Sequence, residues 1–188
     1  MRKILIKLHM YLGLCVGLLL AMIGLTGSII VFGDEIDRLL NPRLLRVEVN
    51  SERATAQGML DAVRVAYPNE KPARMRLPRD HQDSAEICFG ARRDPRCVYV
   101  DPYRTAILGE RVPAHSFKNR VVSLHRRLLS GETGETIIGI CGLLLLTLSA
   151  SGLVLWWPGR KSASRRLKVK RGGGSYRTNF DLHRIVGI

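Results

Sequence analysis

Two long stretches of this sequence carry no Asp, Glu, Lys or Arg, and they constrain the fold more than any other feature. Residues 8–33 form an uncharged run of 26 and residues 136–159 a run of 24. Because about 20 apolar residues span the hydrocarbon core of a bilayer, both runs are predicted to be transmembrane helices. The first run is too long for the apolar core of a signal peptide, and no small-residue cleavage site follows it. We therefore expect an uncleaved membrane helix at the N-terminus.

The charged residues predict how these helices are oriented. Residues 1–10 carry three basic groups and no acid, and residues 158–188 carry nine basic groups against one acid. Residues 33–135 are nearly balanced, with eighteen basic and fifteen acidic groups. By the positive-inside rule both outer segments are cytoplasmic and the middle of the chain is exported. The net charge of +14 lies mostly beside the predicted spans. We therefore expect the basic residues to contact the lipid bilayer and expect no nucleic acid as a partner.

The exported middle has the pattern of a small α+β domain. Residues 53–67 show apolar side chains at spacings of three and four, which predicts a helix. Four runs then predict antiparallel strands: 73–77, 85–89, 96–100 and 105–108. Cys88 and Cys97 flank the turn between the second and third runs. They could form a cross-hairpin disulfide, which an exported location permits, or remain two half-buried thiols.

These patterns divide the chain into six predicted segments. Residues 117–129 form an amphipathic helix that returns to the membrane surface, and Asn179 would cap a new helix. The segments are a first transmembrane helix with its extension (1–40), the α+β domain (41–116), an interfacial segment (117–134), a second transmembrane helix (135–158), a basic linker (159–178) and the start of a third transmembrane helix (179–188).

Three histidines stand where apolar helices begin or end. His9 and His183 share the pattern Leu-His-x-x-x-Gly, in which Gly13 and Gly187 follow one helical turn later. Imidazole can bind haem iron, and a glycine one turn away leaves room for a flat macrocycle. Helix packing through small residues explains Gly13 equally well, and a histidine near the interface can simply contact headgroups.

The predicted topology brings His9 and His183 to the same side of the membrane. Two imidazoles on neighbouring helices could bind one haem b iron from both faces, which suits electron transfer. His125 lies toward the exported side, where it would serve a second site or act as an interfacial polar residue. His81 and His115 have no motif around them and are predicted to lie on the surface.

Four stretches together resemble the PepSY-associated transmembrane family of bacterial inner-membrane proteins. They are Leu-His-x-x-x-Gly at 8–13 running into Gly-Leu-Thr-Gly-Ser at 24–28, Leu-His-x-x-Leu-Leu-x-Gly-x-x-Gly at 124–134, Ser-Gly-Leu-x-Leu-Trp-Trp-Pro at 151–158, and Asn-x-Asp-Leu-His-x-x-x-Gly at 179–187. The resemblance implies a transmembrane α-helical bundle with a small PepSY-like α+β domain in the periplasm, at about residues 34–134. It also implies haem ligation by His9, His125 and His183.

The same resemblance implies a function in iron uptake. Some members of the family are regarded as haem-containing reductases of ferric siderophores, with a membrane or cytoplasmic electron donor. The chain stops within the third predicted helix, so we expect a truncated form of such a reductase, able to form homo-oligomers. The alternative is a membrane-anchored PepSY domain that binds or inhibits an extracytoplasmic protease and needs no cofactor.

Overall fold

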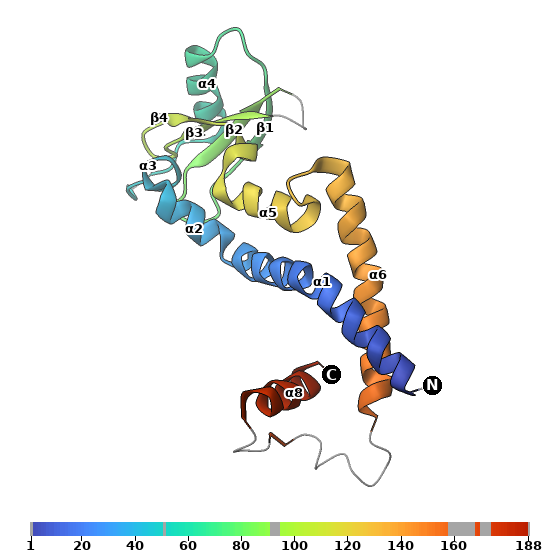
Figure 1. Ribbon diagram of the computed structural model, residues 1–188. Coiled ribbons are helices and arrows are strands. Elements are labelled where there is room, and N and C mark those ends of the chain that lie inside the picture. Colours follow the sequence, from blue (N-terminus) through green and yellow to red (C-terminus); the bar gives the residue numbers. More distant parts are fainter. Residues whose placement is uncertain (1, 51, 91–94, 158–167, 170–173, 188) are drawn as a thin grey trace. The chain divides into compact units, whose positions relative to one another are not determined.

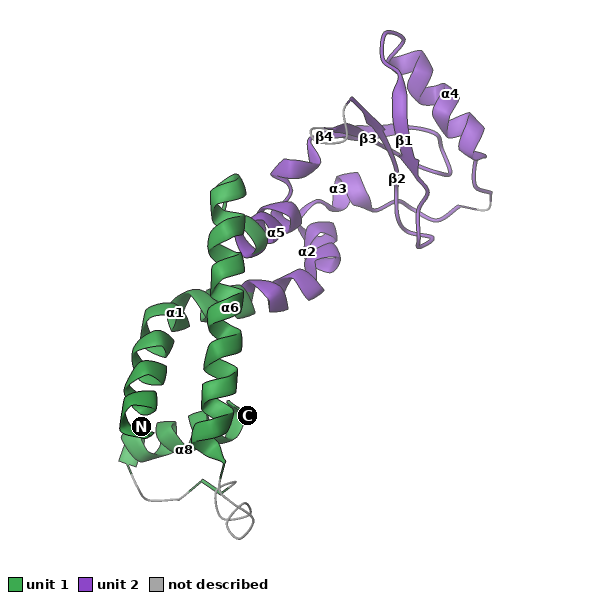
Figure 2. Ribbon diagram, turned by 90° about the vertical axis from the view of Figure 1, so that its right-hand side faces the viewer, with its two compact units in different colours: residues 1–25, 126–188 green, residues 26–125 purple. Residues whose placement is uncertain are grey.

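The computed structural model describes residues 2–50, 52–90, 95–157, 168–169 and 174–187. The chain divides into two compact units, residues 1–25 with 126–188 and residues 26–125 (Figure 2). Figure 1 labels the elements. They are α1 (Arg2–Val31), α2 (Gly33–Leu40), α3 (Pro42–Leu45), α4 (Ala56–Ala66), β1 (Pro72–Arg76), β2 (Ala85–Phe89), β3 (Arg96–Val100), β4 (Ile107–Arg111), η1 (Pro113–His115), α5 (Phe117–Arg127), α6 (Gly131–Trp156) and α8 (Gly174–Val186).

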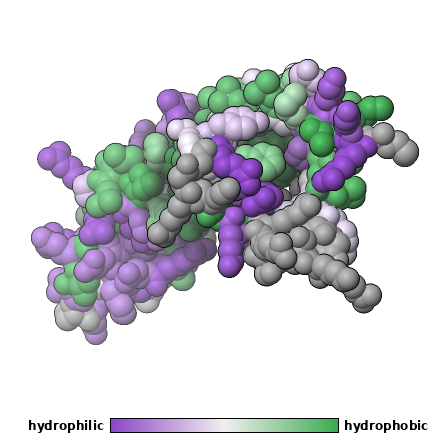
Figure 3. Space-filling model, turned by 60° about the horizontal axis from the view of Figure 1, so that its bottom comes forward, coloured by the Kyte–Doolittle hydropathy of each residue, from purple (hydrophilic) through white to green (hydrophobic). Residues whose placement is uncertain are grey.

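The two predicted membrane helices correspond to α1 and α6, which are both long and apolar enough to cross a bilayer. Their large apolar side chains are mostly uncovered by protein. Leu18 on α1 is 84% exposed and Leu146 on α6 is 68% exposed. Figure 3 shows such hydrophobic residues at the molecular surface. Contiguous apolar surface of this kind marks a contact with lipid or with another protein, and the helix lengths favour lipid.

The structure interrupts the helix that the sequence predicted to continue to residue 40. Phe32 leaves the helical geometry, with φ −99° and ψ 17°, and α2 begins at Gly33. The side chain of Lys118 lies so close that a Cβ at position 33 would come within 3.0 Å of its Cγ. Gly33 therefore lets the Lys118 side chain approach the backbone at the start of α2.

The predicted sheet is present and antiparallel, with strand order β1-β2-β3-β4. The bounds of β2 and β3 coincide with the predicted runs 85–89 and 96–100, whereas the turn predicted at residues 94–95 falls partly outside the described residues. The fourth strand was predicted to start at residue 105 but begins at Ile107. Thr105 has φ 52° and belongs to the preceding turn, because its backbone conformation cannot continue a strand.

Both faces of the central strands are covered, so β2 and β3 are buried almost throughout. Helix α4 packs on one face through Met59 and Val63. The strand side chains on that face alternate along the two strands, and they are Ala85, Ile87, Phe89, Val98 and Val100. On the opposite face a disulfide joins Cys88 to Cys97, directly across the β2–β3 pair, and packs beside Tyr99.

The remaining helix boundaries also differ from the prediction. Helix α4 covers Ala56–Ala66 instead of residues 53–67, and α5 ends at Arg127 instead of residue 129. Helix α6 begins at Gly131, earlier than the predicted residue 135, because the chain turns sharply through left-handed backbone at Leu128 and Leu129. Helix α8 already runs from Gly174, so Asn179 lies inside it and is not its cap. Most of the predicted basic linker, residues 159–167 and 170–173, lies outside the described residues.

Candidate cofactor site

Helix α1 presents His9 to Ser151 on helix α6, within one compact unit. The His9 Nδ1 and Ser151 Oγ atoms are 2.8 Å apart, and the Ser151 hydroxyl donates to the Leu148 carbonyl at 3.1 Å. A hydroxyl has one hydrogen, so Ser151 must accept a hydrogen bond from Nδ1–H of His9. This tautomer leaves the lone pair on Nε2, which is the state that binds a metal.

The second histidine of the shared motif lies beside the first. The rings of His9 and His183 have centroids 6.2 Å apart and planes inclined by 62°. Two imidazoles on opposite sides of one iron, with metal–nitrogen bonds of about 2.0 Å and ring radii of about 1.15 Å, would have centroids about 6.3 Å apart. The observed centroid distance is close to this value, and the two rings meet in an edge-to-face arrangement.

Of the glycines near this site, Gly152 on α6 makes room for the His9 ring. A Cβ at Gly152 would come within 3.3 Å of His9 Cε1, so glycine lets the imidazole lie against the α6 backbone. A Cβ at Gly13 would meet the Leu148 side chain at 3.8 Å, which is ordinary packing between helices. A Cβ at Gly187 would come within 2.7 Å of the His183 carbonyl oxygen. The helix backbone itself therefore disfavours a side chain at position 187.

Helix α8 carries a buried carboxylate two residues before His183. The Asp181 side chain is fully buried and pairs with Arg184 at 3.0 Å and Arg177 at 3.3 Å. Arg184 also donates to the Lys168 carbonyl at 3.2 Å. These contacts tie together the turn of α8 that bears His183. The spacing of Arg177, Asp181 and Arg184 is the sequence signal that could have predicted this cluster.

His125 belongs to the other compact unit, residues 26–125. Its Nδ1 atom lies 3.1 Å from the Thr26 hydroxyl, and a Cβ at Gly27 would come within 3.2 Å of its ring. The ring therefore sits against a small-residue stretch of α1, as the ring of His9 does against α6. His81 and His115 are exposed, as predicted.

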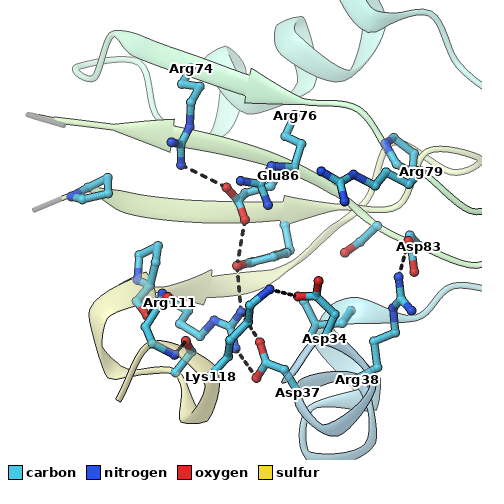
Figure 4. Close-up of a pocket in the computed structure, with 18 of the residues that line it drawn as sticks. Asp34, Asp37, Arg38, Arg74, Arg76, Arg79, Asp83, Glu86, Arg111 and Lys118 are labelled. Carbon is cyan, nitrogen blue, oxygen red and sulfur yellow. Dashed lines mark hydrogen bonds and ion pairs between the residues drawn. The ribbon is translucent and has the colours of Figure 1, made fainter. Parts of the chain in front are cut away.

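The sheet unit contains a second cluster of interest, which the sequence did not predict. Asp37 on α2 accepts two hydrogen bonds from Arg111 on β4, both 2.9 Å long. Arg111 also donates to the Tyr99 hydroxyl, which in turn donates to Glu86 (Figure 4). Burial raises the pKa of Tyr99, and the neighbouring Glu86 carboxylate raises it further against the opposing charge of Arg111.

Asp34 at the start of α2 pairs with Lys118 on α5. The hydrogen bond from Lys118 lowers the pKa of Asp34 below its ordinary value, although partial burial opposes this. The charges of Lys118, Arg38 and Arg79 add to the lowering. Asp34 therefore stays ionised in the unit that contains the sheet.

Two long apolar helices and a small antiparallel sheet define a membrane protein with an α+β unit. A model of the family described as the PepSY-associated TM region matches residues 6–188. The chain therefore belongs to this family, as its four sequence stretches indicated. No curated protein matches the chain.

Proposed function

We propose that the protein is a b-haem electron-transfer protein of the bacterial inner membrane that reduces ferric siderophores. The observation that carries this proposal is the pair of His9 and His183, with centroids 6.2 Å apart and His9 held as the tautomer that can bind metal. Zinc ordinarily has three or four protein ligands. Two imidazoles alone suit haem, whose macrocycle supplies the other four nitrogens.

Each residue of the site has a distinct task in this proposal. His9 and His183 hold the iron, and Ser151 fixes the orientation and tautomer of His9. Gly152 leaves space for the ring, and Asp181 with Arg184 holds the turn of α8 that carries His183. Haem, when bound, would supply a one-electron redox centre. Ligation by two histidines leaves no coordination position for oxygen, which favours electron transfer over oxygen chemistry.

The substrate of the proposed reaction is the ferric iron of a siderophore. Siderophores bind iron(III) through hard oxygen donors, and one-electron reduction to iron(II) weakens this binding and releases the metal. The positive-inside rule supports an orientation with the N-terminus in the cytoplasm and residues 34–134 in the periplasm. His125, held by Thr26 toward the predicted periplasmic side, is the proposed ligand of a second haem.

The test starts from protein purified from bacterial membranes grown with ample haem. We expect a b-type reduced-minus-oxidised absorption spectrum, and His9→Ala and His183→Ala should each remove the same part of it. His115→Ala, at an exposed histidine, is the control and should leave the spectrum unchanged. Colourless protein, or full spectra in both variants, would contradict the proposal and leave the protease-binding hypothesis.

Reduction of the substrate is measured separately. The reduced protein is mixed with a ferric hydroxamate siderophore, and oxidation of the haem is followed together with trapping of iron(II) by a ferrous chelator. We expect both signals to appear in equal amounts. Haem that stays reduced in the presence of the siderophore would exclude this substrate while leaving haem binding intact.

Ser151 offers a sharper test of the site geometry. Ser151→Ala removes the acceptor of the His9 Nδ1–H bond, and loss of such a partner typically weakens metal binding about 10–100-fold. Haem retention and the midpoint potential are the measurements. Ser149→Ala is the matched control, because Ser149 is exposed on the same helix and bonds only the Leu145 carbonyl among the described residues. Equal behaviour of the two variants would show that Ser151 does not position His9.

A further inference from the structure

A charged cavity of about 630 Å³ lies in the sheet unit, and residues of β1, β2, α2 and α5 line it (Figure 4). Its charged lining includes six basic and four acidic side chains. They are Arg38, Arg74, Arg76, Arg79, Arg111 and Lys118, with Asp34, Asp37, Asp83 and Glu86. The proposed haem function does not involve any of them.

Ion pairs account for all four carboxylates of the cavity. The pairs are Arg38–Asp83 at 2.9 Å, Arg74–Glu86 at 3.2 Å, Arg111–Asp37 at 2.9 Å and Lys118–Asp34. Arg76 and Arg79 remain, and neither has an ion pair or a side-chain hydrogen bond with another described residue. Among the described residues that line it, the cavity therefore has six basic and four acidic side chains, an excess of two positive charges.

The two remaining arginines reach the cavity from neighbouring positions. Arg76 lies at the end of β1 directly across from Glu86 on β2, and two residues along the strand from Arg74, so it shares a face with both. Arg79 follows in the loop after β1. Figure 4 shows both guanidinium groups directed toward the carboxylates that line the cavity. Like charges that line one cavity repel each other, and an anion bound between them would relieve this repulsion.

We propose that this cavity binds a phosphate group. A phosphate monoester carries about 1.5–2 negative charges at neutral pH, whereas one carboxylate carries only one. The phosphate charge therefore matches Arg76 and Arg79, which have no ion pair with another described residue. The guanidinium fork forms two parallel hydrogen bonds to phosphate oxygens, and Arg76 and Arg79 supply two such forks. The four carboxylates are already paired, so they restrict the position of the anion without cancelling the excess charge. The phosphate comes from a soluble phosphate ester or from a lipid headgroup.

The experiment uses the full chain in nanodiscs of phosphatidylcholine and titrates phenyl phosphate by calorimetry. We expect saturable binding, weakened at least about tenfold in Arg76→Gln and in Arg79→Gln, because each variant loses hydrogen bonds to a charged group. Arg64→Gln is the matched control, since Arg64 is an exposed arginine of α4 outside the cavity and should leave binding unchanged. Arg76→Lys keeps the charge but loses the fork, so it should bind with intermediate affinity.

A competition experiment identifies the source of the phosphate group, and two results would overturn the proposal. If the natural ligand is a lipid headgroup, phosphatidic acid in the nanodiscs should weaken the binding of phenyl phosphate. If phosphatidic acid leaves the binding of phenyl phosphate unchanged, the ligand is a soluble phosphate ester. Equal binding by wild type and both Gln variants would overturn the proposal. So would a loss in Arg64→Gln as large as the loss in Arg76→Gln, because binding would then follow net charge alone. None of these readouts depends on haem.

Discussion

At the scale of single residues, the pairing of Asp37 with Arg111 contributes to the stability of the sheet unit. The Asp37 side chain is 9% exposed and that of Arg111 16%. Removal of Arg111 leaves the nearly buried Asp37 carboxylate without its charged partner, with the Asn41 amide still donating to it at 2.9 Å. We expect Arg111→Leu to lower the free energy of unfolding by about 3–5 kcal/mol. The measurement is thermal unfolding of the purified protein, followed by circular dichroism. Arg64→Leu breaks an ion pair in which both side chains are 55% exposed and should cost about 0–1 kcal/mol. Similar losses in the two variants would contradict this account.

Tyr99 should make the stability of the protein fall at alkaline pH. A phenol in an unfolded chain has a pKa of about 10, and burial raises the pKa of Tyr99 above this value in the folded protein. Above pH 10 the unfolded chain therefore loses a proton that the folded protein keeps, so stability decreases as pH rises. Tyr99→Phe has no phenol proton to lose, so its stability should decline less steeply as the pH rises above about 10. Parallel declines, measured by chemical unfolding at several pH values, would show that Tyr99 does not contribute.

At the scale of elements, the turn from α5 to α6 depends on Gly134. This residue is buried in the first turns of α6, and a Cβ there would overlap the carbonyl oxygen of Arg127. Because the obstacle is backbone, Gly134→Ala must shift the start of α6, at a cost of about 1–3 kcal/mol. Gly142→Ala on the same helix meets nothing within 4 Å and is the control. Thermal unfolding in detergent compares them, and an unchanged midpoint for Gly134→Ala would disprove the tight turn.

At the scale of the whole molecule, sequence patterns predicted the elements better than their junctions. Alternation and flanking turn residues gave the bounds of β2 and β3 because side chains on adjacent positions face opposite layers. The predicted start of the last helix at Asn179 was wrong, because Asn179 lies inside α8. In the same helix the Asp181 carboxylate is buried and pairs with Arg177 and Arg184. These ion pairs lie at i,i+4 and i,i+3 within one helix, so the spacing of the charges indicated the helix better than the resemblance of Asn179 to a cap.

The candidate sites were predictable only in part. The repeated Leu-His-x-x-x-Gly motif indicated His9 and His183, because identical motifs at predicted helix ends are visible in the sequence itself. Ser151 and Gly152 contact His9 from 142 or more positions away, and Asp37 and Arg111 are separated by 74. No local pattern encodes such pairs. They become apparent only when the fold brings the two elements together.

The division into two units leads to a final prediction that separates the sheet from the proposed haem site. The disulfide and both hydrophobic clusters around the sheet lie within residues 26–125, whereas His9, Ser151 and His183 lie in the other unit. Replacing Cys88 and Cys97 with Ala opens a loop with a sequence separation of 9 and should cost about 2–4 kcal/mol of stability. The b-type spectrum should nevertheless persist at temperatures where the sheet has unfolded. Absorbance and circular dichroism recorded on one sample test this, and simultaneous loss of both signals would mean that the His9–His183 pair requires the folded sheet.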